Sequence, residues 1–220
     1  MKLLLYSGGL PEEIFDMDAQ LLRMIGLSNP KVTLIPSSYE HSEEDYQDYL
    51  SHFGALGLPL WRVLHADRVE SSAEMEEALQ ADFVFLSGGN TFYFLESLRR
   101  SRLLKLLSTY AQSDRVLAGE SAGAILMTPT IQTAAFPEFD RDENASGLKN
   151  LRAMGLVPFE FFPHFQSSRA YDSEFESYTQ SSKRPLYACP DGSGVIIDGV
   201  QMIFVGHVAA YFNGKKFWLK

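Results

Sequence analysis

The residues with the clearest potential for chemistry lie in the segment Gly119-Glu120-Ser121-Ala122-Gly123, which has the pattern G-x-S-x-G. A strand-like apolar run precedes this segment and a helix-like run follows it. The two glycines let the backbone turn tightly, and a helix start offers free N–H groups and the positive end of its dipole. This arrangement is typical of a serine nucleophile exposed on a sharp turn. The simpler interpretation is a small-residue connection in which the serine only caps the helix.

A serine nucleophile needs a base within hydrogen-bond reach, and histidine is the usual choice. His164 follows a strand-like apolar run in the segment FFPHF, so we expect it at the carboxyl end of a strand and favour it as the base. His207 lies in the segment FVGHVAAYF, which is typical of a hairpin, and is the alternative. The other histidines are expected at the surface: His41, His52 and His65.

A carboxylate is needed to orient the imidazole and to stabilise its charged form. Asp191 is one candidate, because it lies in a Pro-Asp-Gly turn after the short strand-like segment PLYAC. An ordinary turn aspartate is the simpler interpretation of this tripeptide. The acidic segment PEFDRDE supplies rivals that composition does not separate from Asp191: Glu138, Asp140, Asp142 and Glu143.

Negative charge on a reacting carbonyl requires backbone N–H groups aimed at it. The amide of Ala122 is one candidate, because it follows the serine at the helix start, and Gly88 and Gly89 in the segment LSGGNT are the others. A glycine turn before a helix capped by Asn90 is the simpler interpretation. The chain has no complete Walker or dinucleotide glycine pattern, so we do not expect it to bind a nucleotide.

Three polar residues near these segments are candidates for substrate binding. Asn90 follows the glycine pair, and Arg169 is the nearest cation after His164. Glu120 adjoins the serine, where it would pair with the free amino group of a substrate and favour exopeptidase action. A solvated or structurally paired acid is the simpler interpretation of Glu120.

The elements that must position these residues follow an alternating pattern. Strand-like runs at 2–7, 31–37, 60–66, 82–89 and 115–121 alternate with segments of helical spacing at 13–26, 41–57, 72–80 and 91–112. This alternation predicts an α/β fold with a doubly wound, mostly parallel sheet and helices on both faces. The last forty residues read as short strands in hairpins that extend or cap the sheet. Sites in such sheets lie beyond the carboxyl ends of the strands.

The composition limits the partners of the chain. Its 220 residues carry 19 basic and 28 acidic side chains, a formal net charge of −9, with no basic run, so nucleic acid is not expected. No apolar stretch approaches the ~18 residues of a membrane span, and the N-terminal run is too short for a signal peptide. We expect no metal or cofactor, a buried Cys189, and a single cytoplasmic domain over residues 1–220, with a homodimer as the candidate assembly.

Four segments occur together and in a fixed order: FLSGGNTFYFLESL, GESAGAILM, FFPHF and CPDGSG. In this combination the chain resembles the family of serine peptidases that contains peptidase E (aspartyl dipeptidase) and cyanophycinase. The resemblance implies a fold similar to class I glutamine amidotransferases, with Ser121 as nucleophile, His164 as base and Asp191 as acid. The order Ser, His, acid differs from the Ser, Asp, His order of α/β-hydrolases.

Two departures separate the chain from the aspartyl dipeptidases. Those proteins typically carry a bulky aromatic residue where Glu120 stands, and an aspartate where this chain has Ala134 or Ala135. Strict selectivity for an N-terminal aspartate is therefore not implied. The leading hypothesis is a serine peptidase that cleaves small peptides through an acyl-enzyme. The alternatives are a non-catalytic binding or sensing module and a hydrolase of a non-peptide amide; amidotransferase chemistry would require cysteine in place of Ser121.

Overall fold

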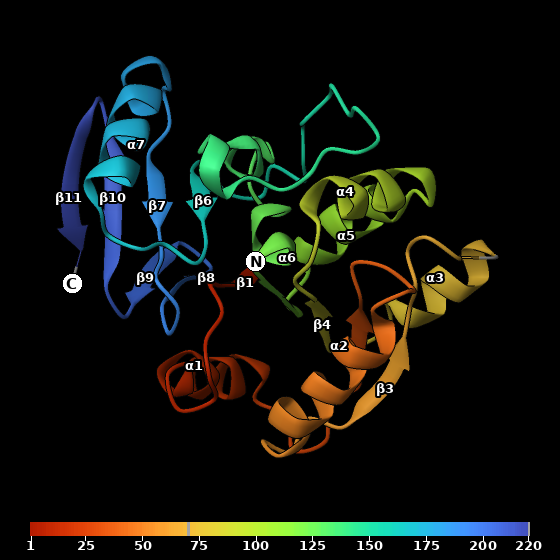
Figure 1. The fold of residues 1–220 in the computed structure, drawn as a ribbon. Coiled ribbons are helices and arrows are strands. Elements are labelled where there is room, and N and C mark those ends of the chain that lie inside the picture. The colour runs from red at the N-terminus through yellow and green to blue at the C-terminus, as the bar shows by residue number, and fades with distance from the viewer. Residues whose placement is uncertain (70, 220) are drawn as a thin grey trace.

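The computed structural model describes residues 1–69 and 71–219, so the last residue of the expected C-terminal hairpins, Lys220, lies outside it. Two sheets organise the described chain (Figure 1). The larger has the order β3-β2-β4-β5-β1-β8-β9, in which the first five strands pair in parallel and the last two pair antiparallel. Its strands are β1 (Lys2–Tyr6), β2 (Val32–Ile35), β3 (Leu60–Val63), β4 (Phe83–Leu86), β5 (Val116–Glu120), β8 (Gly194–Asp198) and β9 (Gln201–Val205).

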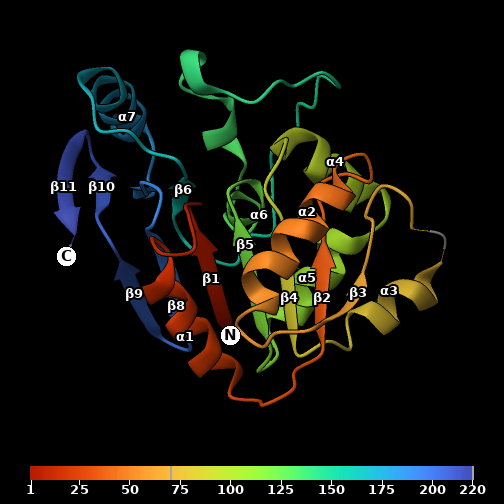
Figure 2. The ribbon, with the colours of Figure 1, turned by 60° about the horizontal axis from the view of Figure 1, so that its bottom comes forward.

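Helices cover both faces of this sheet (Figure 2), which confirms the expected doubly wound α/β architecture. On one face lie α1 (Phe15–Ile25), α2 (Ser42–Tyr49) and the π-helical turn Leu50–Gly54 that continues α2. On the other lie α3 (Ser72–Ala78), α4 (Thr91–Arg100), α5 (Leu103–Ala111) and the short α6 (Ala122–Ile125). Successive strand residues alternate between the faces, so Leu4 and Phe85 contact the first helix layer while Leu5 and Leu86 contact the second.

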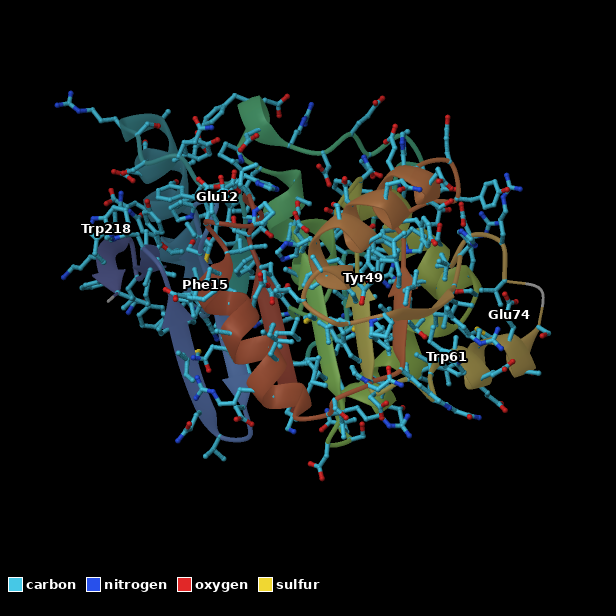
Figure 3. The ribbon with its side chains drawn as sticks, turned by 90° about the horizontal axis from the view of Figure 1, so that it is seen from below. Glu12, Phe15, Tyr49, Trp61, Glu74 and Trp218 are labelled. Carbon is cyan, nitrogen blue, oxygen red and sulfur yellow. The ribbon has the colours of Figure 1, made fainter. Side chains whose placement is uncertain are left out.

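The smaller sheet has the order β11-β10-β7-β6. Its strands are β6 (Glu160–Phe162), β7 (Leu186–Ala188), β10 (Val208–Phe212) and β11 (Lys215–Leu219). Helix α7 (Arg169–Ser181) packs on it through Phe175, which is fully buried. Figure 3 places Trp218 of β11 and Trp61 of β3 at opposite ends of the molecule.

The second sheet corrects the expectation that the whole C-terminal tail extends or caps one sheet. Strands β8 and β9 do extend the large sheet, whereas β10 and β11 pair with β7. The chain changes direction at Gly206, whose φ of 75° is accessible to glycine at little cost. Alternation of side chains predicts each strand but carries no information about which sheet receives it.

Two further expectations are corrected. The segment 91–112 forms two helices, because Arg102 adopts a φ of 69° and ends the helical path after Arg100. His52 is not a surface residue: its side chain is 14% exposed and its Nε2 lies 2.8 Å from Asp18 Oδ2, under the sheet face that α1 and α2 cover. The residues expected to do chemistry lie beyond the carboxyl ends of β1, β4, β5, β6 and β7.

Candidate active site

Ser121 occupies the sharp turn between β5 and α6. Its backbone has a φ of 51° and a ψ of −111°, a conformation that costs energy for any residue with a side chain. The flanking glycines are required by close packing: a Cβ on Gly119 would lie 2.5 Å from the carbonyl carbon of Gly123, and one on Gly123 would lie 2.4 Å from the Leu86 oxygen. The spacing of glycines around the serine therefore brings β4, β5 and α6 close together and projects Ser121 from the sheet.

His164 joins Ser121 to Asp191. Its Nε2 lies 2.9 Å from Ser121 Oγ, and its Nδ1 lies 2.7 Å from Asp191 Oδ1. With Nδ1–H donated to the carboxylate, Nε2 is free to accept the serine proton. The imidazole and the carboxylate are each about half exposed, so a substrate can reach them. The structure thus brings together Ser121, His164 and Asp191, the three residues that the family resemblance implied as nucleophile, base and acid.

Parallel pairing of β6 with β7 sets the separation of His164 and Asp191. The paired ends of these strands are Phe162 and Ala188, so the loops that follow them leave the same edge of the smaller sheet. Asp191 lies in the expected turn, which is closed by a hydrogen bond from the Ser193 N–H to the Pro190 carbonyl.

Ser7 connects the two sheets at this point, a role that the sequence interpretation missed. The His164 backbone N–H donates to Ser7 Oγ at 2.7 Å, and the Ser7 hydroxyl donates to the Cys189 carbonyl at 2.7 Å. Ser7 is fully buried, and so is Cys189, whose thiol pKa is raised by that burial. The available signal was the segment Ser7-Gly8-Gly9 after the first strand, in the same position as the glycine loops after β4 and β5.

Gly8 permits the imidazole and carboxylate to approach β1. A Cβ at this position would lie 2.7 Å from His164 Cε1 and 3.1 Å from Asp191 Oδ1, and its φ of 139° is one that other residues rarely adopt. The Gly8 carbonyl also accepts a hydrogen bond from the Gly192 N–H at 2.8 Å. The first glycine after Ser7 is therefore part of the packing that holds the histidine and the acid together.

Three backbone N–H groups near Ser121 have no hydrogen-bond partner within the described ranges: those of Gly88, Gly89 and Ala122. A Cβ on Gly88 would lie 3.6 Å from Ser121 Cβ, which places this loop beside the serine. At Gly89, where φ is 120°, a Cβ would lie 2.2 Å from Ser37 Oγ. These free donors are of the type that stabilises negative charge on a carbonyl oxygen.

Neither Asn90 nor Arg169 has a hydrogen bond or ion pair with Ser121, His164 or Asp191 in the described chain. Asn90 Oδ1 caps α4 by accepting from the Tyr93 N–H, and Asn90 Nδ2 donates to the Glu143 carbonyl, as in the capping interpretation. Arg169 is exposed at the first position of α7 and, in residues 1–69 and 71–219, has no hydrogen bond or ion pair with the Ser121, His164 and Asp191 group.

Three of the four rival acids have side-chain partners of their own, and the fourth, Glu143, accepts from Asn90 through its backbone carbonyl. Asp142 Oδ2 accepts from the Thr91 N–H, and Asp140 Oδ2 accepts from the Tyr171 hydroxyl. Glu138 pairs with Arg141 at 2.7 Å. His164 makes its carboxylate contact with Asp191 instead.

The remaining histidines lie apart from the serine. His41 and His207 are exposed, and the ring of the half-buried His65 stacks edge-on with Tyr39. His52 is engaged by Asp18.

A small cavity of about 100 Å³ adjoins Ser121 and His164. Ala134, one of the two positions where the resemblance places an aspartate, lines it, as does Thr133, whose buried hydroxyl has no hydrogen-bond partner in the described chain. Asp140 and Asp142 supply its charge, and no lysine or arginine is among the described residues that line it.

Neither a membrane-crossing helix nor a metal-binding group was found in the described chain. Its helices are too short or too polar to cross a bilayer. In the same residues there is no cluster of three or more His, Cys, Asp or Glu side chains placed to hold a metal ion.

Comparison with known proteins identifies similar chains. The model of peptidase family S51 matches residues 3–205. An uncharacterised peptidase of Listeria monocytogenes is 30% identical over 136 residues, which cover 61% of this chain and 65% of that protein, slightly less than two thirds of its length. The peptidase E of a Nostoc species is 28% identical over 189 residues, which cover 82% of this chain and 71% of that protein.

Solved structures show the same fold. A candidate peptidase E protein from Listeria monocytogenes has a TM-score of 0.71 at 24% identity, covering 92% of this chain and 96% of that one. A peptidase from an acI-B1 Actinobacterium has a TM-score of 0.72 at 18% identity, covering 99% and 93%. Both neighbours are consistent with the amidotransferase-like fold that the resemblance implied.

Proposed function

We propose that this chain, which belongs to peptidase family S51, is a serine peptidase that hydrolyses small peptides through an acyl-enzyme on Ser121. The observation that carries this proposal is the pair of contacts made by His164, at 2.9 Å to Ser121 Oγ and at 2.7 Å to Asp191 Oδ1. A nucleophile bonded to a base, with the base bonded to an orienting carboxylate, is the arrangement that acyl transfer requires.

In the first half-reaction Ser121 Oγ attacks the carbonyl carbon of the scissile amide while His164 Nε2 takes its proton. Asp191 holds the Nδ1–H and stabilises the imidazolium that forms. The carbonyl oxygen becomes an oxyanion, for which the N–H groups of Gly88, Gly89 and Ala122 are the donors. His164 then gives its proton to the leaving amine as the C–N bond breaks, and the acyl group remains as an ester on Ser121.

In the second half-reaction a water molecule replaces the departed amine. His164 takes a proton from this water as it attacks the ester, and the same N–H groups receive the new oxyanion. Collapse of that intermediate returns the proton to Ser121 Oγ and releases the carboxylic acid. His164 is exposed, so solvent water can reach it.

The alternatives predict different geometry or chemistry. A non-catalytic module would favour a Ser121 to His164 separation beyond hydrogen-bond range, and the observed 2.9 Å gives it no support. Amidotransferase chemistry would need cysteine where Ser121 stands. A hydrolase of a non-peptide amide would use the same residues, so the choice of substrate in the experiment separates it from a peptidase.

Strict selectivity for aspartate is not part of the proposal. The carboxylates of Asp140 and Asp142 in the small cavity would repel an acidic side chain. Arg169, the nearest cation after His164 in sequence, does not line this cavity.

The test compares wild type with the Ser121→Ala variant on fluorogenic dipeptide and tripeptide amides. We expect kcat to fall by at least about 1000-fold in the variant, the scale seen when a triad nucleophile is removed. Ser72→Ala, at an exposed position on α3, is the matched control and should turn over at the wild-type rate. Equal turnover by wild type and Ser121→Ala would reject the proposal, and turnover of non-peptide amides alone would favour the amide hydrolase.

A further inference from the structure

A larger cavity of about 490 Å³ lies beside the glycine loop that flanks Ser121. Gly88 and Gly89 form part of its wall, and so does Glu120, the residue before the serine. Two more carboxylates, Asp45 and Asp48 of α2, line it as well. Two of the donors assigned to the oxyanion, those of Gly88 and Gly89, therefore border the same space as Glu120.

The charged side chains that line this cavity are mainly acidic. Among the described residues that line it there is no lysine or arginine, and its histidine, His52, is engaged by Asp18 at 2.8 Å. Asp45 accepts a hydrogen bond from the Ser87 hydroxyl, whereas the carboxylate of Glu120 accepts none within residues 1–69 and 71–219.

The environment of Glu120 disfavours its charged form. Burial raises its pKa, His164 lowers it, and the carboxylates of Asp191, Asp48 and Asp45 raise it further. A partly buried carboxylate without a partner costs free energy, and a cation placed beside it would recover that cost.

We propose that Glu120 is the specificity-determining residue of this cavity and that it binds the cationic group of a peptide substrate, an ammonium or a guanidinium. This inference rests on the proposed peptidase function. It assigns the substrate class as peptides that carry a positive charge next to the scissile carbonyl, the opposite of the acidic residue that the aspartyl dipeptidase resemblance would imply.

The remaining walls of the cavity suit the apolar part of such a substrate. Four aromatic residues line it: Tyr6, Tyr49, Phe53 and Phe85. All four lie on the sheet face that α1 and α2 cover, and Tyr49 of α2 is labelled in Figure 3. Aromatic rings pack against the methylene stem of lysine or arginine and attract a cation through their faces. The cavity thus combines carboxylates for the charged end with apolar surface for the stem.

Two parts of a peptide carry such a group. If Glu120 bound a free N-terminal amine, the protein would be an exopeptidase that cleaves at a fixed distance from the N-terminus. A lysine or arginine side chain would instead make it selective for a basic residue. The charge chemistry is the same, so substrate pairs must vary the two sources separately.

The experiment uses the full chain and fluorogenic peptide amides in matched pairs. One pair has a free or an acetylated N-terminus, and the other has lysine or norleucine at the residue that supplies the scissile carbonyl. We expect kcat/KM to favour the charged member of at least one pair by about 10- to 100-fold, mainly through KM, the range of a hydrogen bond to a charged group. The pair that shows the preference identifies the source of the cation.

Variants of Glu120 test the assignment. Glu120→Gln should remove most of the preference, and Glu120→Asp, which keeps the charge, should retain part of it. Glu76→Gln, at an exposed acid on α3, removes the same formal charge and should leave the preference intact. Circular dichroism and thermal unfolding of each variant establish that it is folded.

The outcomes also separate this inference from the peptidase proposal. If turnover by the wild type depends on Ser121 but kcat/KM is equal for the charged and uncharged members of both pairs, the role of Glu120 is overturned. The peptidase proposal is then unaffected. The same holds if Glu120→Gln keeps the full preference. Absence of any Ser121-dependent turnover would overturn both.

Discussion

The backbone N–H of His164 donates a hydrogen bond to the hydroxyl of Ser7 across 157 residues of sequence, at 2.7 Å. Because that hydroxyl also donates to the Cys189 carbonyl, one buried side chain joins β1 to the segments that carry His164 and Asp191. We infer that Ser7 is a positioning residue for the base.

Replacing Ser7 with alanine should therefore lower kcat more than it raises KM. Loss of both bonds leaves the His164 N–H unpaired, at a cost of about 1–3 kcal/mol, whereas the Cys189 carbonyl still accepts from the Phe165 N–H at 3.0 Å. Steady-state kinetics and thermal unfolding check this, with Ser72→Ala as the surface control. A structural role alone would lower the melting temperature and leave kcat of the folded enzyme unchanged.

Gly8→Ala tests how closely the histidine and acid must approach β1. The added Cβ would lie 2.7 Å from His164 Cε1, so the ring must move. Misplacement of a reacting group by about 1 Å can cost roughly 100-fold in rate, and we expect a loss of kcat of that order. Gly57→Ala is the matched control, since Gly57 also has a positive φ, of 79°, but has open space around it. If the two variants had equal activity, the loss of kcat would come from backbone strain at a positive φ and not from displacement of the His164 ring.

Asp191→Asn should nearly abolish activity while the fold persists. An amide at this position donates as well as accepts, so the imidazole loses the constraint on its tautomer and the stabilisation of its charged form. The expected decrease in kcat is about 10,000-fold. Glu138→Gln, a change at one of the rival acids, should retain wild-type kcat because Glu138 pairs with Arg141. If Glu138→Gln abolished activity and Asp191→Asn retained it, the acid that orients His164 would lie in the acidic segment 137–143 instead.

Much of this site was predictable because each part ends a strand. The glycines around Ser121, the proline before His164 and the turn at Asp191 are local signals, and the parallel sheet gathers strand ends at one edge. The fold class followed from the alternation of short apolar runs with helical spacing.

The rest depends on contacts between segments that are distant in sequence. Ser7 acquires its role only when β1 lies beside the loops of the smaller sheet, and His52 is buried where it faces Asp18 of α1. Arg102 ends a helical path with neither glycine nor proline to signal the break. The break at Arg102 and the burial of His52 thus have no signal in the residues next to them.

Glu120→Gln should raise the stability of the folded protein at neutral pH. Burial first, and then nearby carboxylates, hold the Glu120 pKa above its usual 4.5, although His164 opposes them. The folded state therefore favours protonated Glu120. That contribution is fully present below about pH 4.5 and is lost as the pH rises through the raised pKa.

The melting temperature of Glu120→Gln should consequently exceed that of wild type at pH 7, and the gap should close as the pH approaches 4. Thermal unfolding between pH 4 and 8 measures it, with Glu76→Gln as the control for loss of a surface charge. A gap that widened toward low pH would show that Glu120 is stabilised as the carboxylate.

The central claim is that Ser121 is a nucleophile activated by His164. Its most direct test is intact-protein and peptide mass spectrometry after reaction with a fluorophosphonate, which reports covalent chemistry without any assumption about the substrate. We predict one adduct per chain, located on Ser121, abolished in Ser121→Ala and strongly slowed in His164→Ala. A wild-type chain that stays unlabelled, or an adduct on another residue that persists in Ser121→Ala, would contradict the account.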